Sequence, residues 1–255
     1  MLVTTPKDLK PGETLPAIVE YYGGGWVMGS PEFAQLHTLL SHRVVAFLPQ
    51  YRVAPDHKFP TAPNDAYDAL RWVQEHGAAH HANLDQLMVA GTSAGGNMAA
   101  VVAQLARSDQ TNAAPKVRAQ LLWIPCVEFV LHTASFAKHV STPIWNTHKQ
   151  LEARRAYFES PEQYTDPRAS PLLAASHAGL PPAFIVRDAE DPFYDDALLY
   201  EQALRTAGVP VASAEFDTYH AGALIMLKMG GYKAEWARTK AALDSFFATH
   251  VLHRP

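Results

Sequence analysis

Short apolar segments alternate along this chain with segments of helical periodicity, and this alternation limits the fold more than any other feature. Six segments read as strands: Ala17–Tyr22, Arg43–Leu48, Gln86–Ala90, Ala119–Ile124, Ala183–Arg187 and Val211–Phe216. Helical patterns lie between and after them, at Asp65–His76, Ala94–Arg107, Asp195–Ala207 and Tyr232–Thr249. Such alternation builds right-handed βαβ units, and near-continuous apolar strands are typical of a sheet buried on both faces. The pattern predicts an α/β fold with a mostly parallel central sheet and helices on both faces.

One segment interrupts the alternation. Between Val127 and Ser176 there is no clear strand, but aromatic residues are frequent: Phe129, Phe136, Trp145, Tyr157, Phe158 and Tyr164. We expect a helical insertion at about 127–176, packed over the edge of the sheet. No repeat or linker divides the rest of the chain, and 255 residues suffice for one large core. The sequence therefore predicts a single domain over 1–255.

The composition argues against several kinds of partner. A net charge of −4 and the lack of a dense Lys/Arg run disfavour nucleic acid. No apolar run approaches the roughly 18 residues of a membrane-spanning helix, and the first residues lack the apolar core of a signal peptide. Cys126 is the only cysteine, so no intrachain disulfide can form, and it reads as a small buried residue at a strand end. We expect a cytoplasmic protein without membrane insertion.

The segment GTSAGGNM (Gly91–Met98) stands between a predicted strand and a predicted helix. Gly91, Ser93 and Gly95 match the pattern G-x-S-x-G, in which a sharp turn holds a serine in a strained conformation that small neighbours permit. Ligands of parallel sheets bind beyond the carboxyl ends of the strands, and Ser93 lies just beyond one. Any tight turn favours glycine, so the motif alone is weak, but its strand–turn–helix setting favours a nucleophile.

A nucleophilic serine needs a base, and the base needs an orienting carboxylate. In folds of this type the order along the chain is Ser, Asp or Glu, His. Asp191 follows the predicted strand Ala183–Arg187, and His220 follows Val211–Phe216. Because parallel neighbours place their carboxyl ends at one edge, both residues should lie beside Ser93.

Other residues compete for these roles. Asp188 and Glu190 are alternative orienting carboxylates, whereas Asp195 and Asp196 suit the positive end of a helix dipole. The remaining histidines have plainer interpretations. We expect no metal site at His76, His80 and His81, because they lie at a predicted helix end without a set of carboxylate or cysteine partners. We expect the three histidines of the insertion on its surface: His132, His139 and His148.

Three consecutive glycines, Gly23–Gly25, directly follow the first predicted strand in YYGGGWVMG. Such a run marks a tight turn or a backbone that another group approaches closely. Acyl transfer requires hydrogen-bond donors near the developing oxyanion, which this loop could supply. Phosphate binding is the competing function, but neither G-x-G-x-x-G nor a P-loop lysine is present.

Taken together, YGGGW, YRVAPDHKFP, GTSAGGN, DPFYDDALLYEQALRTAGVPV and YHAG resemble the hormone-sensitive-lipase-like branch of the α/β-hydrolases, which are serine carboxylesterases. The resemblance runs from about Leu15 to about Phe247, with five motifs in the family's order. It implies an α/β-hydrolase fold, no metal and no organic cofactor. The family's Asp-Pro pair selects Asp191 over its acidic neighbours.

The same resemblance implies a role for each matching residue. It makes Ser93 the nucleophile, Asp191 the orienting carboxylate and His220 the base. The oxyanion donors that it implies are the backbone N–H groups of Gly24, Gly25 and Ala94. It also assigns Tyr51, Arg52 and Pro55 to a motif that supports the glycine loop without touching substrate.

Three features depart from the family pattern. Tyr22 stands where the family usually has a histidine before its glycines, so the hydrogen bonds that anchor the loop should differ. YHAGAL replaces the more usual His-Gly-Phe beside His220. Only about 16 residues precede the first predicted strand, where members of the family typically carry helices that cap the site. The expected cap is therefore reduced, built mainly by 127–164, or supplied by a second subunit in a homodimer, and the acyl pocket should be widened.

The residues and the resemblance together predict a serine carboxylic-ester hydrolase. With Trp26, Phe33 and the insertion's aromatics expected near the mouth of the site, small or medium uncharged esters are the favoured substrates. The same residues would also serve a lactone, amide or carbamate hydrolase. A small-molecule receptor that kept the fold and lost the chemistry is the alternative from another class of protein.

Overall fold

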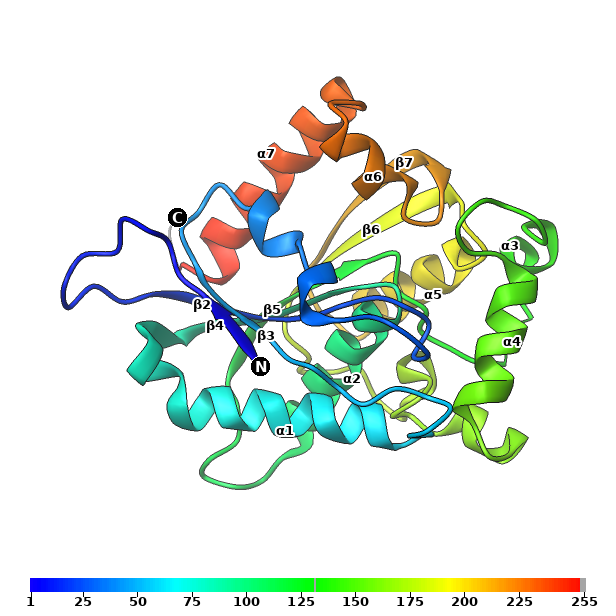
Figure 1. Cartoon of the computed structure of the whole chain (residues 1–255), viewed down its shortest axis with the longest axis horizontal. Coiled ribbons are helices and arrows are strands. Elements are labelled where there is room, and N and C mark those ends of the chain that lie inside the picture. Colours follow the sequence, from blue (N-terminus) through cyan, green and yellow to red (C-terminus); the bar gives the residue numbers. More distant parts are fainter. Residues whose placement is uncertain (131, 253–255) are drawn as a thin grey trace.

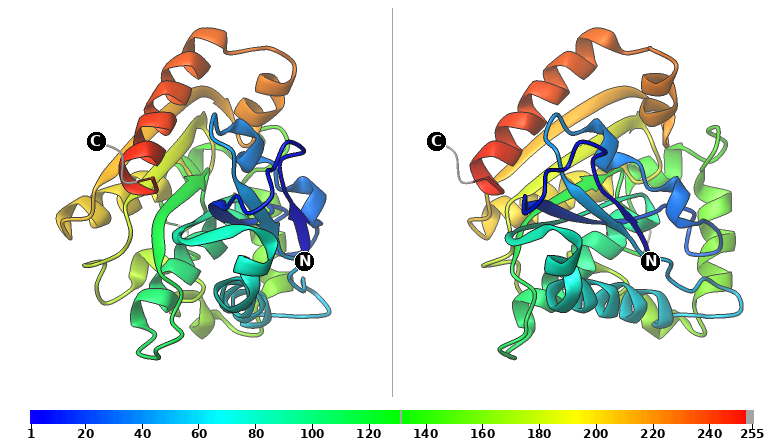
Figure 2. Two further views of the ribbon diagram at one scale, coloured as in Figure 1. Left: turned by 90° about the vertical axis from the view of Figure 1, so that its left-hand side faces the viewer. Right: turned by 60° about the vertical axis from the view of Figure 1, so that its left-hand side comes forward.

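A seven-stranded sheet forms the centre of the molecule in the computed structural model, which describes residues 1–130 and 132–252 (Figures 1 and 2). The strands follow the spatial order β1-β3-β2-β4-β5-β6-β7. Their bounds are Leu2–Thr4 (β1), Leu15–Tyr21 (β2), Val45–Leu48 (β3), Ala82–Thr92 (β4), Val117–Trp123 (β5), Ala183–Glu190 (β6) and Val211–Tyr219 (β7). The predicted α/β class is confirmed, because all neighbouring strands from β3 to β7 pair in parallel.

Strand β1 is the exception, since it pairs antiparallel with β3, with Leu2 opposite Leu48. The apolar pattern did not predict it, because it is three residues long and exposed or half-buried. The central strands are different: every residue of β2 and β3 is buried. That burial is what their near-continuous apolar runs predicted.

Helices cover both faces of the sheet. α1 (Thr61–His76) and α2 (Ala94–Ser108) pack together on one face, and α7 (Lys233–His250) covers the other (Figure 2). α5 (Tyr194–Thr206) follows β6, and the short α6 (Gly222–Lys228) follows β7. Single 3₁₀ turns occur at Pro31–Phe33, Leu36–Leu39, Gly77–His80, Pro161–Thr165 and Pro171–Leu173. No helix of the described residues has the length and apolar character that crossing a bilayer requires.

The insertion contains α3 (Ala134–Lys138) and α4 (Thr147–Tyr157), and its described part has no strand. The expectation that it packs over the sheet's edge was wrong, because the edges are β1 and β7. Instead α4 stands beyond the carboxyl ends of the strands (Figure 1). Ring contacts hold it there, since Tyr157 stacks on Trp26 at 5.3 Å between ring centroids. The insertion is thereby joined to the loop after β2.

His139 corrects a second expectation about the insertion. It was expected on the surface together with His132 and His148, but its exposed fraction is only 6%. The residue ends α3, and its carbonyl oxygen accepts a hydrogen bond from the N–H of Thr147 at 3.2 Å. Joining two helix ends encloses the imidazole, and this burial lowers the pKa of His139. The other two imidazoles are exposed as expected.

Candidate active site

Ser93 occupies the turn between β4 and α2. Its φ of 57° and ψ of −118° place a non-glycine residue in a sparsely populated conformation. The Ser93 N–H is held by the carbonyl oxygen of Trp123 at 2.9 Å. A Cβ on Gly95 would clash with the backbone carbonyl of Tyr21, so the turn packs directly on β2 and tolerates only glycine there. The strained serine thus rests on two neighbouring strands.

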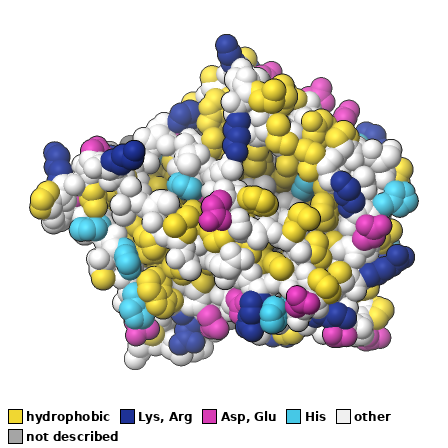
Figure 3. Space-filling model, in the orientation of Figure 1, with side chains coloured by type: hydrophobic (Ala, Val, Ile, Leu, Met, Phe, Trp, Pro, Cys, Tyr) yellow, Lys and Arg dark blue, Asp and Glu magenta, His cyan; other side chains and the backbone are white. Residues whose placement is uncertain are grey.

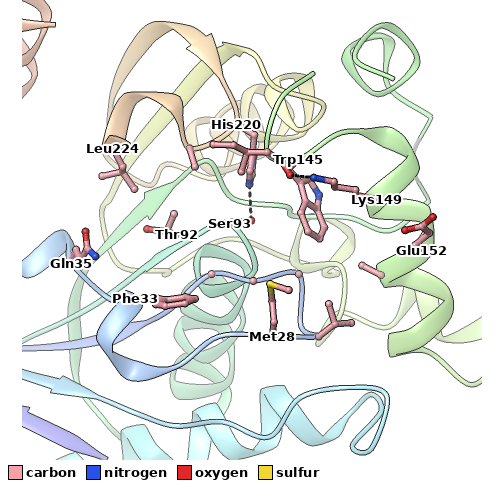
Figure 4. Close-up of a pocket in the computed structure, with 17 residues that line it drawn as sticks. Met28, Phe33, Gln35, Thr92, Ser93, Trp145, Lys149, Glu152, His220 and Leu224 are labelled. Atoms are coloured by element: carbon pink, nitrogen blue, oxygen red, sulfur yellow. Dashed lines mark hydrogen bonds between the residues drawn. The ribbon is translucent and has the colours of Figure 1, made fainter. Parts of the chain in front are cut away.

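The structure brings Ser93, His220 and Asp191 together at the carboxyl ends of three strands. His220 Nε2 lies 2.9 Å from Ser93 Oγ, and Nδ1 lies 2.6 Å from Asp191 Oδ2; Figure 4 shows the first of these contacts. The exposed fractions are 7%, 3% and 1% for Ser93, His220 and Asp191. An ionised carboxylate at Nδ1 keeps the ring proton there, which leaves the Nε2 lone pair to accept the serine proton. The arrangement can activate a hydroxyl group.

Asp191 is oriented by its own turn, because its Oδ1 accepts a hydrogen bond from the N–H of Phe193 at 2.8 Å. The competing acids lie elsewhere. Glu190 is exposed, and Asp195 accepts the N–H of Ser135 in the first turn of α5. Asp188 is fully buried one turn before Asp191 and forms no hydrogen bond with the imidazole of His220 among the described residues.

The buried carboxyl of Asp188 has a pKa far from its usual range. Desolvation, together with the nearby Asp191 charge, raises this pKa from 3.8 to about 9, although the backbone N–H groups of Ala221 and Ala223 oppose the shift. Asp188 therefore carries a proton at neutral pH. Because Asp188 is neutral, the negative charge of this pair of acids lies on Asp191, the carboxylate that contacts His220.

Replacing Asp188 by asparagine should flatten the pH dependence of stability. The native state retains a proton between pH 3.8 and about 9 that the unfolded chain releases, so stability falls as pH rises through this window. One such group contributes a limiting slope of about 1.4 kcal/mol per pH unit. In urea unfolding from pH 5 to 9, the free energy of unfolding of Asp188→Asn should increase relative to that of the wild type as pH rises. Parallel curves of unfolding free energy against pH would contradict the shifted pKa.

The glycine loop follows β2 and faces Ser93. Gly23, Gly24 and Gly25 line the same cavity as Ser93 and His220. Positive φ angles of 139° at Gly24 and 60° at Gly25 curl the loop, and the Gly24 carbonyl oxygen accepts the N–H groups of Val27 and Met28. None of the described residues accepts a hydrogen bond from the N–H of Gly24, Gly25 or Ala94. These donors are available to an oxygen atom in the cavity.

Tyr22 anchors the loop through a reciprocal pair with Tyr51. The Tyr22 hydroxyl donates to the Tyr51 carbonyl oxygen at 2.9 Å, and the Tyr51 hydroxyl donates to the Tyr22 carbonyl oxygen at 2.7 Å. The two rings stack with centroids 4.2 Å apart. Further along, the N–H of Ala54 donates to the carbonyl oxygen of Trp26. The Tyr51 segment therefore supports the glycine loop from below without lining the cavity.

Tyr22→Phe should lower both stability and turnover. Loss of the hydroxyl leaves the buried Tyr51 carbonyl without its donor, at a cost of about 1–3 kcal/mol in unfolding free energy. The loosened glycine loop should reduce kcat about tenfold with little change in KM. Tyr21→Phe is the matched control, since it removes an equally buried bond, to the Ala66 carbonyl at 2.9 Å, on α1. Equal kcat losses in the two variants would refute the anchoring role.

The cavity beside Ser93 has a volume of about 650 Å³, which suits a small to medium ligand. Its other walls come from residues that sequence reasoning did not place there: Val27, Met28, Gln35, Ile144, Lys149, Glu152, Ala153 and Leu224. Val27, Met28 and Leu224 lie in the quoted segments YYGGGWVMG and YHAGAL, but those segments do not show which side chains face a cavity. The other five residues carry no motif. Hydrophobic side chains gather on the part of Figure 3 that corresponds to α6. Three exposed apolar residues belong to α6 or directly follow it: Ile225, Met226 and Met229.

Trp26 is not at the mouth of the cavity, as the sequence had suggested. Its side chain is 1% exposed and packs on Phe129 and Tyr157, because a positive φ of 62° turns it under the loop. Phe33 does line the cavity, with 60% of its side chain exposed. Of the insertion's aromatic residues, Trp145 alone lines the cavity among those described.

Two further sequence expectations concern groups outside the cavity. Cys126 is a fully buried free cysteine, and burial raises the pKa of its thiol well above the ordinary value. His76 and His80 pack against Trp72. Within residues 1–130 and 132–252, no group of three His, Cys, Asp or Glu side chains could hold a metal ion.

Comparisons with known proteins identify the family of the chain. The family model described as alpha/beta hydrolase fold matches residues 18–223. The esterase LipI of Mycobacterium tuberculosis is 37% identical over 202 residues, which cover 77% of this chain and 62% of LipI. The carboxylesterase NlhH of the same species is 37% identical over 207 residues, which cover 78% and 63%. The chain thus spans less than two thirds of the length of either relative.

A solved structure extends the similarity to the whole fold. The crystal structure of a thermostable esterase from Pseudomonas putida ECU1011 superposes with a TM-score of 0.86 at 31% identity, covering 98% of this chain and 78% of that one. The family model spans most of the sheet and all three strand ends that meet at Ser93. The chain belongs to the α/β-hydrolase family, in its hormone-sensitive-lipase-like branch.

Proposed function

We propose that the protein is a serine carboxylic-ester hydrolase that works through an acyl-enzyme. The observation that carries the proposal is the continuous hydrogen-bonded path from Ser93 Oγ through His220 to Asp191, beside a cavity with unused backbone donors. Relatives named esterase and carboxylesterase support the same reaction class.

In the first half-reaction, Ser93 Oγ bonds to the ester carbonyl carbon while His220 Nε2 takes the hydroxyl proton. The carbonyl oxygen becomes negative and accepts hydrogen bonds from the N–H groups of Gly24, Gly25 and Ala94, which stabilise it most when its charge is greatest. The intermediate then collapses, the bond to the alcohol oxygen breaks, and His220 gives its proton to the leaving alcohol.

In the second half-reaction, water attacks the acyl-enzyme. His220 Nε2 takes a proton from the water, and the same donors stabilise the second oxyanion. Collapse releases the acid and returns the proton to Ser93. Asp191 holds the Nδ1 proton throughout and favours the imidazolium that forms twice per cycle. The reaction needs neither a metal nor an organic cofactor.

The cavity favours small to medium uncharged esters. Apart from the reacting groups, its walls are mostly apolar, and its two charged residues, Lys149 and Glu152, have opposite sign on one helix. The insertion supplies this wall and acts as a reduced cap. A volume of about 650 Å³ holds a compact ester but leaves no room for a long triglyceride.

Hydrolysis of p-nitrophenyl esters with acyl chains from acetyl to dodecanoyl tests the proposal. We expect turnover of the short and medium chains, a burst of p-nitrophenol from acyl-enzyme formation, and covalent labelling of Ser93 by a fluorophosphonate. Mass spectrometry of the labelled peptide identifies the modified residue. A folded protein that neither hydrolyses any of these esters nor reacts with the probe would overturn the assignment.

The same triad would also cleave lactones, amides or carbamates. A lactone is a cyclic ester whose leaving alcohol stays tethered to the acyl group, an amide has an amine as its leaving group, and a carbamate carries nitrogen on its carbonyl carbon. Parallel assays with a lactone, an anilide and an aryl carbamate separate these reactions. Ester hydrolysis should have a higher kcat/KM than anilide or carbamate hydrolysis, because an amine leaves less readily than an alkoxide and the carbamate nitrogen makes the carbonyl carbon less electrophilic. Tight binding of a ligand that is never cleaved would indicate a receptor.

A further inference from the structure

We propose that Trp145 sets the upper size limit for one of the two substituents of the ester. The inference rests on the proposed hydrolase function and specifies the substrate class of the same site: esters that combine one compact and one larger apolar substituent. Trp145 belongs to the insertion and carries no family motif.

The cavity extends to two sides of the Ser93–His220 pair. In Figure 4, Phe33, Gln35 and Leu224 lie on one side, and Trp145, with Lys149 and Glu152 behind it, lies on the other. An ester bound with its carbonyl carbon at Ser93 Oγ must direct its acyl and alcohol groups away from each other. Each substituent therefore meets a different wall.

Trp145 narrows its side of the cavity close to the reacting atoms. The six-membered ring of the indole packs directly on Gly25, so closely that a Cβ on this residue would clash with it. The indole centroid is also 6.2 Å from that of the His220 imidazole. A substituent on this side must fit between the indole and the reacting atoms. On the opposite wall no aromatic ring packs against the imidazole among the described residues of the cavity, and Phe33 is 60% exposed.

Hydrogen bonds hold the indole in place. Trp145 Nε1 donates to Gln150 Oε1 at 3.1 Å, and Gln150 is fully buried. The Gln150 amide donates in turn to Cys126 Sγ at 3.6 Å. The Trp145 backbone is fixed as well, since its N–H donates to the Pro143 carbonyl at 2.7 Å. A side chain held at both ends cannot swing aside for a larger substituent.

The turn that presents Trp145 is strained. Ile144 has a φ of 64°, which is costly for a β-branched residue. Lys149 Nζ donates to the Ile144 carbonyl oxygen at 2.6 Å and stabilises this conformation. Strained residues persist where surrounding contacts enforce them, and they cluster at ligand-binding sites. The strain is consistent with a turn built to place the indole in the cavity.

Two homologous ester series test the role of Trp145. One lengthens the acyl group from acetyl to octanoyl on p-nitrophenol, and the other lengthens the alcohol from methanol to octanol on acetic acid, assayed by proton release. We expect Trp145→Ala to raise the ratio of kcat/KM for the long and short ends of one series by about tenfold or more. Which series responds identifies the substituent that faces Trp145. Trp145→Phe should shift the same ratio less.

The ratio compares two substrates on one preparation, so a partly unfolded variant does not distort it. Trp72→Ala is the matched control, because Trp72 lies on α1 outside this cavity, and it should leave both profiles unchanged. Unchanged profiles in Trp145→Ala would overturn the inference while leaving the hydrolase assignment intact. Absence of any Ser93-dependent turnover in the wild type would instead overturn the proposed function.

Discussion

Replacing Ser93 by alanine should lower kcat for p-nitrophenyl acetate by about 10⁴- to 10⁶-fold. The variant lacks the only atom that can form the acyl-enzyme, whereas the oxyanion donors and the cavity remain. Alanine has the backbone preferences of serine closely enough to keep the turn at φ 57°, and no other described residue depends on Ser93 Oγ besides His220. Initial rates and thermal unfolding of the two proteins, measured side by side, separate lost chemistry from lost folding.

Ser108→Ala is a suitable control for this comparison. Ser108 is exposed at the last residue of α2, the helix that begins beside Ser93, and its replacement should leave kcat unchanged. A non-hydrolysable ester analogue should bind the wild type and Ser93→Ala with similar Kd, because binding does not need the nucleophile. If Ser93→Ala kept more than a tenth of the wild-type kcat, Ser93 would not be the nucleophile.

Replacing Asp191 by asparagine should lower kcat by about 10⁴-fold with little effect on KM. The amide can donate a hydrogen bond to His220 Nδ1, which favours the tautomer with the proton on Nε2. In that tautomer Nε2 can no longer accept the serine proton, and the imidazolium loses its negative neighbour. Steady-state kinetics on p-nitrophenyl acetate and butyrate measure the effect.

Asp188→Asn is the matched control for this change. Both acids are buried in the same turn, but Asp188 carries its proton at neutral pH, so its asparagine variant is nearly isosteric and equally neutral. It should keep kcat within about threefold of the wild type, while stability changes with pH as described above. If Asp188→Asn lost activity and Asp191→Asn retained it, the orienting carboxylate would be Asp188.

Most of the fold could be predicted from the order and apolarity of local segments. The four long helices α1, α2, α5 and α7 lie within a few residues of their predicted bounds. α1, α5 and α7 bury part of their surface at helical spacing, whereas α2 is buried on nearly all sides. Most of the predicted strands were found because they are buried and nearly continuously apolar, whereas β7 is largely half-buried and carries several polar residues. β1 was not predicted, because a short edge strand depends on pairing with its partner β3 rather than on its own composition.

The candidate site divides in the same way. Ser93, Asp191 and His220 could be singled out because each follows a strand at a turn, and parallel strands deliver such turns to one edge. Trp26 and Trp145 show where this reasoning ends. Both are tryptophans in irregular segments, yet Trp26 is turned under its loop and Trp145 lines the cavity. Backbone conformation and long-range packing decide that difference.

The sequence by itself determined the layered α/β fold, the family and the residues that can carry the chemistry, because these depend on local periodicity and short motifs. Only the tertiary structure decided how Tyr22 anchors the glycine loop and which side chains limit the cavity. Those outcomes depend on contacts between residues far apart in the chain, such as Tyr22 with Tyr51 and Gly25 with Trp145. No local pattern records such contacts.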